Sequence, residues 1–463
     1  MLRHFRINDP YRLISLLVLL ILASLPFLIN LSAITLQELK DMVIGEEVGD
    51  KIMYVEIIDQ TAPLMALTDG FLDFFFGRSL LSRHILALII IFFQASYFGI
   101  LLINNKAYNE SNYLPSLIFG FLCFFSFDLL AITPELLACC LLLLGLNNLF
   151  KEIEFRVDKD SVVLNLGVFL GLASLFVFSY TIFLIGAVVI LIIFARASLR
   201  KISLLLFGYG LVHAILITYY YCYERADELW ANFYVANISQ ASVSLVAMNA
   251  IFMLAIVPIV YFIFSLFMLT REAHFTRYQS QLFQVMFLWL AISIVQIWLT
   301  PTLTPHSFFT FIPPLSYFIS HYLLLINRKW IAELMLWLFI LGLPTLNLLS
   351  RHQILSRVDY SELFPKLVSH DYEISGKKVM ILGNDFSLYQ RNEMAGYFLN
   401  WELSRKYFEQ PDYYENISKI NKAFLQDPPE VIIDPGGYME TIIERIPKLK
   451  EAYRKDASIY FKR

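Results

Sequence analysis

Charged residues are scarce in this sequence. Asp, Glu, Lys and Arg together make up 16% of the 463 residues, whereas 58% of the chain is hydrophobic. A soluble domain is about half apolar and about a quarter charged. The shortage of charge therefore argues against an ordinary soluble protein and predicts a chain that is surrounded by membrane lipid.

Cysteine and excess positive charge are also lacking. The four cysteines, at 123, 139, 140 and 222, lie in or beside apolar segments, and their spacing matches no zinc motif. We interpret them as packing residues and predict no metal site from them. The net charge of -3 gives no concentrated basic face, which excludes nucleic acid as an expected partner.

Long apolar segments recur along the first three quarters of the chain, and a membrane helix needs about 20 such residues. We expect a polytopic α-helical membrane protein with about eleven transmembrane helices. These are Leu13–Ile29, Ile85–Ile103, Leu114–Ile132, Glu135–Phe150, Val162–Phe176, Tyr180–Phe194, Ile202–Tyr221, Ala247–Leu269, Leu282–Leu299, Phe308–Ile326 and Trp330–Leu349. The fifth and sixth are short, so a re-entrant hairpin remains an alternative for that pair.

The loops between these segments predict the orientation, because cytoplasmic loops carry an excess of Lys and Arg. If the N-terminus is cytoplasmic, most basic loop residues fall on that side, among them Arg12, Lys151, Arg200 and Lys329. An odd number of spans then places everything after Leu349 outside. We expect a multi-pass protein of the cell inner (plasma) membrane, divided into a transmembrane domain, 1–349, and a periplasmic domain, 350–463.

Two expected external parts stand out. The first loop, residues 30–84, is rich in carboxylates, and its second half has apolar residues at helical spacing, which predicts a helix lying on the membrane surface. The tail has lower hydropathy. "KKVMILG", "PEVIID" and "ASIYFKR" predict strands, whereas "YYENISKINKAFLQD" and "METIIERIPKLKEAYRK" predict amphipathic helices, so we expect a small α/β domain.

The first-loop carboxylates are the main candidates for chemistry. Acidic groups beside a membrane are costly unless they face water, a cation or a polar ligand. A cluster of them therefore indicates a site, although a solvated loop with no site is the alternative.

The stretch "MYVEIIDQTAPLMALTDGFLDFFFGRSLLSRHILAL" resembles the first-loop signature of the GT-C superfamily of membrane glycosyltransferases. The likeness is to the branch of protein mannosyltransferases and aminoarabinose transferase, and to multi-span proteins of Bacteroidota that carry this same loop. "AITPELLACCLLLLGL" and "TPHSFFTFIPPLSYFISHYLLL" resemble later segments of the family. The first-loop positions that match are Tyr54, Glu56, Asp59, Pro63, Leu64, Phe76, Gly77 and Ser79.

The resemblance implies a function and a site. It implies transfer of a sugar from a polyprenyl-phosphate donor to an envelope acceptor at the external face, with an acidic residue that acts as base or holds a divalent cation. On this basis Glu38 is the expected catalytic acid, supported by Asp59 and Glu46. The expected contacts to the lipid phosphate and substrate are Arg78, Arg83, His306 and Tyr54.

Two departures from the family pattern leave an alternative open. Gln37 stands where the family usually has Asp, and residues 177–180 lack the Lys that many members place near the donor phosphate. The alternative is a catalytically inactive component of a secretion, gliding or assembly complex that binds envelope proteins. A transporter is a weaker third class, since Asp128 is the only acid outside the first and last four residues of an expected span and no internal repeat is found.

Overall fold

The computed structural model describes residues 1–154, 160–239, 243–272, 275–355, 357–365 and 374–463. Its contacts divide the chain into two compact units. The helical unit contains Met1–Ser32, Leu80–Leu216 and Ala241–Tyr360. The loop–tail unit contains Ala33–Ser79, Ile217–Gln240 and Ser361–Arg463, so the first loop and the tail, far apart in sequence, belong to one unit.

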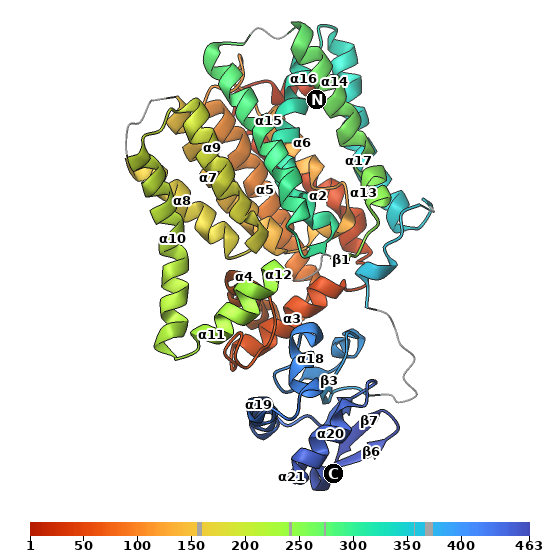
Figure 1. Cartoon of the computed structure of the whole chain (residues 1–463). Helices are drawn as coiled ribbons and strands as arrows, with labels where there is room; N and C mark the ends of the chain where they lie inside the picture. Colours follow the sequence, from red (N-terminus) through yellow and green to blue (C-terminus); the bar gives the residue numbers. More distant parts are fainter. Residues whose placement is uncertain (155–159, 240–242, 273–274, 356, 366–373) are drawn as a thin grey trace. The chain divides into compact units, whose positions relative to one another are not determined.

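The helical unit is built from long apolar helices (Figure 1). Seven helices in the described part of the chain are long and apolar enough to cross a membrane. They are α2 (Arg12–Ile29), α5 (Leu80–Asn104), α7 (Pro134–Ile153), α10 (Leu199–Cys222), α15 (Arg277–Trp298), α16 (Ile312–Leu325) with the preceding turn η4 (Pro305–Phe311), and α17 (Lys329–Arg351). The membrane character predicted from composition is confirmed.

The remaining expected spans fall on shorter or bent elements. Helices α13 (Met248–Leu254) and α14 (Ile256–Glu272) form a pair bent by 65° that counts as an eighth span if it crosses as one. Pro258 lies in the first turn of α14, where its missing N–H removes no helical hydrogen bond. The other three are α6 (Leu114–Leu122), followed by η1 (Phe127–Leu130), α8 (Asp160–Ser174), and α9 (Ile182–Phe194), preceded by η2 (Phe178–Thr181). Among the described residues, seven or eight spans are therefore found by length and composition, and the count of eleven is not confirmed.

Close helix packing in this unit depends on glycine. A Cβ built on Gly167 of α8 would lie 2.2 Å from the carbonyl oxygen of Leu205, and one built on Gly208 of α10 would lie 2.4 Å from that of Leu164. Only the absence of both side chains allows the two backbones to approach this closely, as small residues do at helix crossings in membranes.

In the loop–tail unit, the first loop forms two helices, α3 (Leu36–Val48) and α4 (Pro63–Phe76). They cross at Gly45, where a Cβ would lie 2.6 Å from the carbonyl oxygen of Asp69. Helix α4 exposes the apolar face expected from the sequence, since Leu67, Phe71, Phe74 and Phe75 are all 59% exposed or more. The amphipathic helix expected in this part of the loop is present.

The tail contains a five-stranded mixed sheet with the order β4-β3-β5-β7-β6. The strands are β3 (Lys378–Ile381), β4 (Glu393–Met394), β5 (Val431–Ile433), β6 (Tyr453–Asp456) and β7 (Ile459–Lys462), and the helices are α18 (Trp401–Glu409), α19 (Tyr414–Gln426), α20 (Tyr438–Arg445) and α21 (Pro447–Ala452). The expected strands correspond to β3, β5 and β7. The last expected helix is divided by Pro447 into α20 and α21, and β4, β6 and α18 were not predicted.

Backbone hydrogen bonds join the first loop to the tail within this unit. The amide of Ile58 donates to the carbonyl of Tyr397 at 2.7 Å, and the amide of Asn400 donates to the carbonyl of Ile58 at 3.0 Å. Ile58 is fully buried in the same apolar core as Met380 and Ile432. The sequence places the domain boundary at 349, whereas the contacts group residues 33–79 and 217–240 with the tail.

Candidate functional site

Glu38 lies in the first turn of α3 and forms a capping box with Thr35. The amide and hydroxyl of Thr35 donate to Oε2 of Glu38 at 3.0 Å and 2.8 Å, and the Glu38 amide donates to the Thr35 hydroxyl at 3.2 Å. This arrangement satisfies helix N-terminal donors. It also fixes the orientation of a buried carboxylate, 8% exposed, in the part of the loop where the resemblance places the acid.

Asp59 and Tyr54 are both fully buried, and each forms a hydrogen bond with Thr61. Asp59 forms an ion pair with Lys40 at 2.9 Å and accepts hydrogen bonds from the amide and hydroxyl of Thr61. The hydroxyl of Tyr54 donates to the Thr61 carbonyl at 2.7 Å. Tyr54 also has a positive φ of 68°, a conformation that is rare for non-glycine residues and marks a strongly constrained turn.

Arg78 and Glu46 pair with each other. The guanidinium binds both carboxylate oxygens of Glu46, and its remaining donors reach the carbonyls of residues 389, 390 and 392 at 2.7 Å, 3.2 Å and 3.1 Å. The hydrogen bond to Glu46 raises the pKa of Arg78 above its ordinary value. This guanidinium therefore fastens the first loop to the loop that precedes β4, and all of its nitrogens are already in use.

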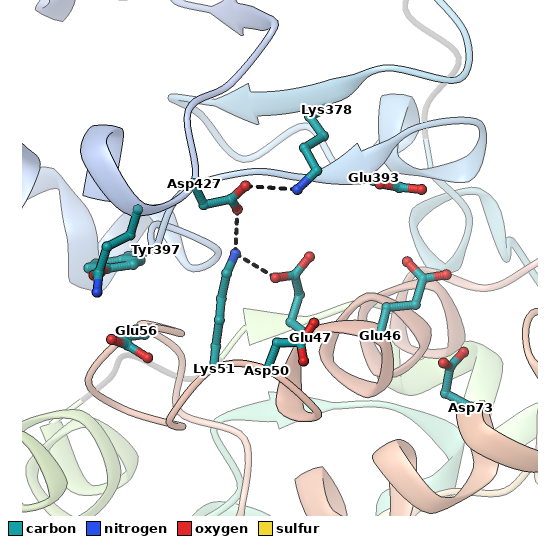
Figure 2. Close-up of a pocket in the computed structure, with 11 residues that line it drawn as sticks. Glu46, Glu47, Asp50, Lys51, Glu56, Asp73, Lys378, Glu393, Tyr397 and Asp427 are labelled. Carbon is teal, nitrogen blue, oxygen red and sulfur yellow. Dashed lines mark hydrogen bonds and ion pairs between the residues drawn. The ribbon is translucent and has the colours of Figure 1, made fainter. Parts of the chain in front are cut away.

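A cavity of about 640 Å³ lies within the loop–tail unit beside Glu46 (Figure 2). Helix α3 and the residues after it supply one wall, and β3, β4 and the C-terminal end of α19 supply the other. None of the eleven lining residues is aliphatic. They are Glu46, Glu47, Asp50, Lys51, Glu56, Asp73, Lys378, Glu393, Tyr397, Gln426 and Asp427.

Asp427 is the central acceptor of this cavity, and Figure 2 shows it between two lysines. Lys51 reaches Asp427 at 2.6 Å and Glu47 at 2.5 Å, and Lys378 reaches Asp427 at 3.0 Å. Burial raises the pKa of Asp427, but the hydrogen bonds from both lysines outweigh this and hold it below its usual range. Burial raises the pKa of Glu47, and Lys51 opposes that shift only in part.

His306 lies in the helical unit, in η4, and contacts Asp128 of η1. Nε2 of His306 is 3.2 Å from Oδ2 of Asp128, and both side chains are buried. Ser126 donates to the other oxygen of Asp128. Nδ1 of His306 is buried and has no hydrogen-bond partner among the described residues.

Arg83, the last of the predicted phosphate contacts, lies on α5 of the helical unit and is 6% exposed. The hydrogen bonds and ion pairs described above join some of the predicted residues to one another. Glu46 and Arg78 form a pair, Asp59 and Tyr54 meet through Thr61, Glu38 pairs with Thr35, and His306 and Arg83 belong to the other unit.

Several polar groups at these places were not singled out as site residues. Asp41 and Asp69, in α3 and α4, are 2% and 0% exposed, and Gln37 donates to Asp41 at 2.7 Å. Asp427 and Lys51 are 376 residues apart, so no local pattern could join them. One feature of the sequence points to these residues. Charged residues are scarce in the chain, so each carboxylate is a candidate for a functional role.

The part of the chain that the structure describes contains no group of three or more His, Cys, Asp and Glu arranged to hold a metal ion. Three carboxylates of the first loop, Asp59, Glu47 and Glu46, are instead paired with Lys40, Lys51 and Arg78. The divalent cation that the family resemblance offers as one option stays a prediction, and no step below depends on it.

Comparisons with known proteins give a structural likeness without a sequence likeness. No family model matches the chain, and no curated protein matches it. The solved structure of ArnT from Cupriavidus metallidurans bound to undecaprenyl phosphate is similar with a TM-score of 0.54 and 12% identity, over 96% of both chains. The apo oligosaccharyltransferase of Archaeoglobus fulgidus gives a TM-score of 0.47 and 9% identity, over 91% of this chain and 69% of that one.

Proposed function

We propose that this chain, which shares the fold of ArnT along almost its whole length, is a membrane glycosyltransferase of the GT-C type that moves a sugar from a polyprenyl-phosphate donor to an envelope acceptor at the external face. The observation that carries the proposal is the structural match to ArnT, which covers 96% of this chain and 96% of ArnT. The structure of ArnT holds undecaprenyl phosphate. The first-loop match to the GT-C signature supports it independently.

The proposed topology has eleven spans in the cell inner membrane, with the N-terminus in the cytoplasm. The eight longer or bent elements and the three shorter helices α6, α8 and α9 together correspond to the eleven apolar segments of the sequence. The first loop and the tail then both lie on the periplasmic side. Their shared apolar core supports this assignment, because two parts of one folded unit belong in the same compartment.

In the proposed reaction, an acceptor hydroxyl oxygen attacks the anomeric carbon of the donor sugar. The new glycosidic C–O bond forms as the bond from that carbon to the phosphate oxygen breaks, and polyprenyl phosphate leaves with the electron pair. Glu38 is the proposed base that takes the hydroxyl proton. A base held in orientation by a third group is effective in such a step, and Thr35 holds one oxygen of Glu38.

The proposed contact to the phosphate is His306, assisted by Arg83. With Nε2 of His306 directed at Asp128, Nδ1 is the ring nitrogen that can meet a phosphate oxygen. Asp59, Glu46, Tyr54 and Arg78 support the site by fixing the first loop, since their polar groups bind other residues of the loop–tail unit.

A second candidate function is a catalytically inactive component of an envelope assembly. The capping box favours it, because Glu38 has a complete structural role without any chemistry, and Gln37 occupies the position where the family usually has Asp. Under this candidate, the fold would bind envelope proteins and would transfer nothing.

The test is to purify the full chain in detergent and identify the copurifying lipid by mass spectrometry. The wild type is expected to retain a polyprenyl phosphate or its sugar adduct, and His306→Ala is expected to lose at least tenfold of it, as for a charged hydrogen bond. His352→Ala is the matched control, because His352 is exposed in the same unit and is expected to retain the lipid. Stoichiometric protein partners without polyprenyl lipid in the wild type would contradict the transferase and support the second candidate.

A further inference from the structure

Exposed tyrosines lie at the C-terminal end of helix α10, one of the seven long apolar helices. Tyr219 and Tyr221 in its last turn, and Tyr223 directly after it, are all more than half exposed. Phe207 and Ile215, earlier in the same helix, are also more than half exposed. Exposed apolar residues of a membrane helix face lipid, and tyrosine is enriched where such a helix reaches the lipid head groups. The tyrosines therefore mark the level of the head groups at the end of α10.

A cluster of basic residues lies in the loop–tail unit, and its first member comes three residues after α10 ends. The other three members come from helices α18 and α19 of the tail. The members of this basic cluster are Arg225, Lys406, Lys419 and Lys422. Arg225 binds Glu228 at 3.1 Å, and Nζ of Lys422 is 3.8 Å from a carboxylate oxygen of Glu56, so these two cations have acidic partners.

The other two members, Lys406 and Lys419, have no acidic partner. Their Nζ atoms lie 5.1 Å and 5.0 Å from the centre of the Tyr407 ring, and neither forms an ion pair among the described residues. Burial lowers the pKa of Lys419 to about 8; Glu228 opposes this shift, and the other three members of the basic cluster add to it. Cations brought together in this way repel one another, so a bound anion would stabilise them.

From these features we infer that the basic cluster binds the phosphate groups of an anionic phospholipid surface, with Lys406 and Lys419 as the main contacts. Lys and Arg clustered beside the end of a membrane helix are attracted to anionic head groups. An ammonium group has three donors and no acceptor, which suits phosphate oxygens. The partner is the phospholipid of the bilayer itself, so the inference does not rest on sugar transfer and holds equally for an inactive relative.

The connection to a membrane helix favours lipid over a dissolved anion. Arg225 follows Tyr223 by two residues, so their Cα atoms lie within about 7 Å of each other. Arg225 in turn acts on Lys419 electrostatically. The chain therefore keeps the basic cluster close to the tyrosines at the level of the head groups, where lipid phosphates are concentrated.

The test is acetylation of the lysines in the full chain, followed residue by residue by mass spectrometry. Nanodiscs of phosphatidylcholine alone are compared with nanodiscs that also contain phosphatidylglycerol. Phosphatidylglycerol is expected to slow the labelling of Lys406 and Lys419 about fivefold, the size of one cation's attraction to an anionic surface, and high salt is expected to reverse this. Lys448 and Lys450 are the internal controls, because they are exposed in the same unit outside the cluster and are expected to keep their rates.

A variant links the protection to the cluster without removing a labelled lysine. Arg225→Gln removes one cation of the cluster and is expected to reduce the protection of Lys419. Arg454→Gln is the matched control, since it removes the same charge from an exposed position of the same unit and is expected to leave the protection unchanged.

Three outcomes would overturn the inference. The first is equal labelling of Lys406 and Lys419 in the two kinds of nanodisc. The second is equal slowing of Lys448 and Lys450 by phosphatidylglycerol, which would reflect the bulk charge of the bilayer and no local site. The third is protection by inorganic phosphate in phosphatidylcholine nanodiscs that matches protection by phosphatidylglycerol, which would assign the cluster to a dissolved anion.

Discussion

Three carboxylates of the loop–tail unit differ from Asp128 of the helical unit in the groups that bind them. In the loop–tail unit, Glu46, Asp59 and Asp427 are paired with full cations, supplied by Arg78, Lys40 and Lys51. In the helical unit, Asp128 is bound by Ser126 and His306, and His306 keeps one nitrogen without a partner among the described residues. We infer from this comparison that an ion pair between a carboxylate and a full cation holds chain segments together. A side chain with an unbound nitrogen, such as that of His306, can instead bind a ligand.

The largest effect on stability is expected from Arg78→Ala. The change leaves Glu46 without its cation and removes the donors of three backbone carbonyls, so the free energy of unfolding is expected to fall by about 2–4 kcal/mol. Thermal unfolding of the purified protein measures this.

Arg445→Ala is the control for that change, because Arg445 and its partner Asp412 are both exposed and the pair is expected to contribute nothing measurable. If both variants have the melting temperature of the wild type, the Arg78–Glu46 pair does not stabilise the fold. The comparison between the two units is then wrong.

Lys51→Met is expected to cost about 1–3 kcal/mol at pH 7, because Lys51 donates to Asp427, Glu47 and the Gly396 carbonyl. Since the folded pKa of Asp427 is depressed, its contribution to stability is fully present above its unfolded value of about 3.9 and is lost as pH falls through the folded pKa.

The melting temperatures of wild type and Lys51→Met are therefore expected to converge as pH falls from 5 toward 2. Measurements at several pH values in that interval provide the check. A gap that stays constant with pH would mean that the Lys51 contribution is not electrostatic.

Thr35→Ala is expected to have the smallest of these effects, about 1 kcal/mol, through loss of the capping box. Glu38→Gln is the more specific variant, because Gln can also form a capping box. The free energy of unfolding is therefore expected to change by only a few tenths of a kcal/mol. Chemical denaturation measures both. A large loss of stability in Glu38→Gln would show that the negative charge of Glu38 stabilises α3. Loss of turnover in this variant would then not test the role of Glu38 as base.

Local patterns predicted a good part of the fold. The apolar segments locate the membrane helices, and the spacing of Leu67, Phe71 and Phe74 predicts the exposed face of α4. Strands of alternating or continuous apolar residues, such as β3 and β5, were also predicted, since their burial is visible in hydropathy. The two-residue strand β4 and the break after α6 have no such signal, because their positions depend on tertiary contacts.

The site was less predictable for the same reason. The sequence drew attention to Arg78 and Glu46 but not to their mutual pairing across 32 residues, and it did not indicate that Asp427 would meet Lys51. The roles of Glu38, His306 and Arg83 stay predictions. Which charges neutralise one another is decided by the packing of distant segments, whereas residue type alone shows only that each charge needs a partner.

The most direct test of the central claim is turnover. The full chain in proteoliposomes would be supplied with a polyprenyl-phosphate-linked sugar and an envelope extract as acceptor, and release of sugar-free polyprenyl phosphate would be followed by mass spectrometry. We predict release by the wild type and by Arg445→Ala, whose side chain is exposed, with at least a hundredfold loss in Glu38→Gln. Absence of release by the wild type, or equal release by Glu38→Gln, would contradict the account.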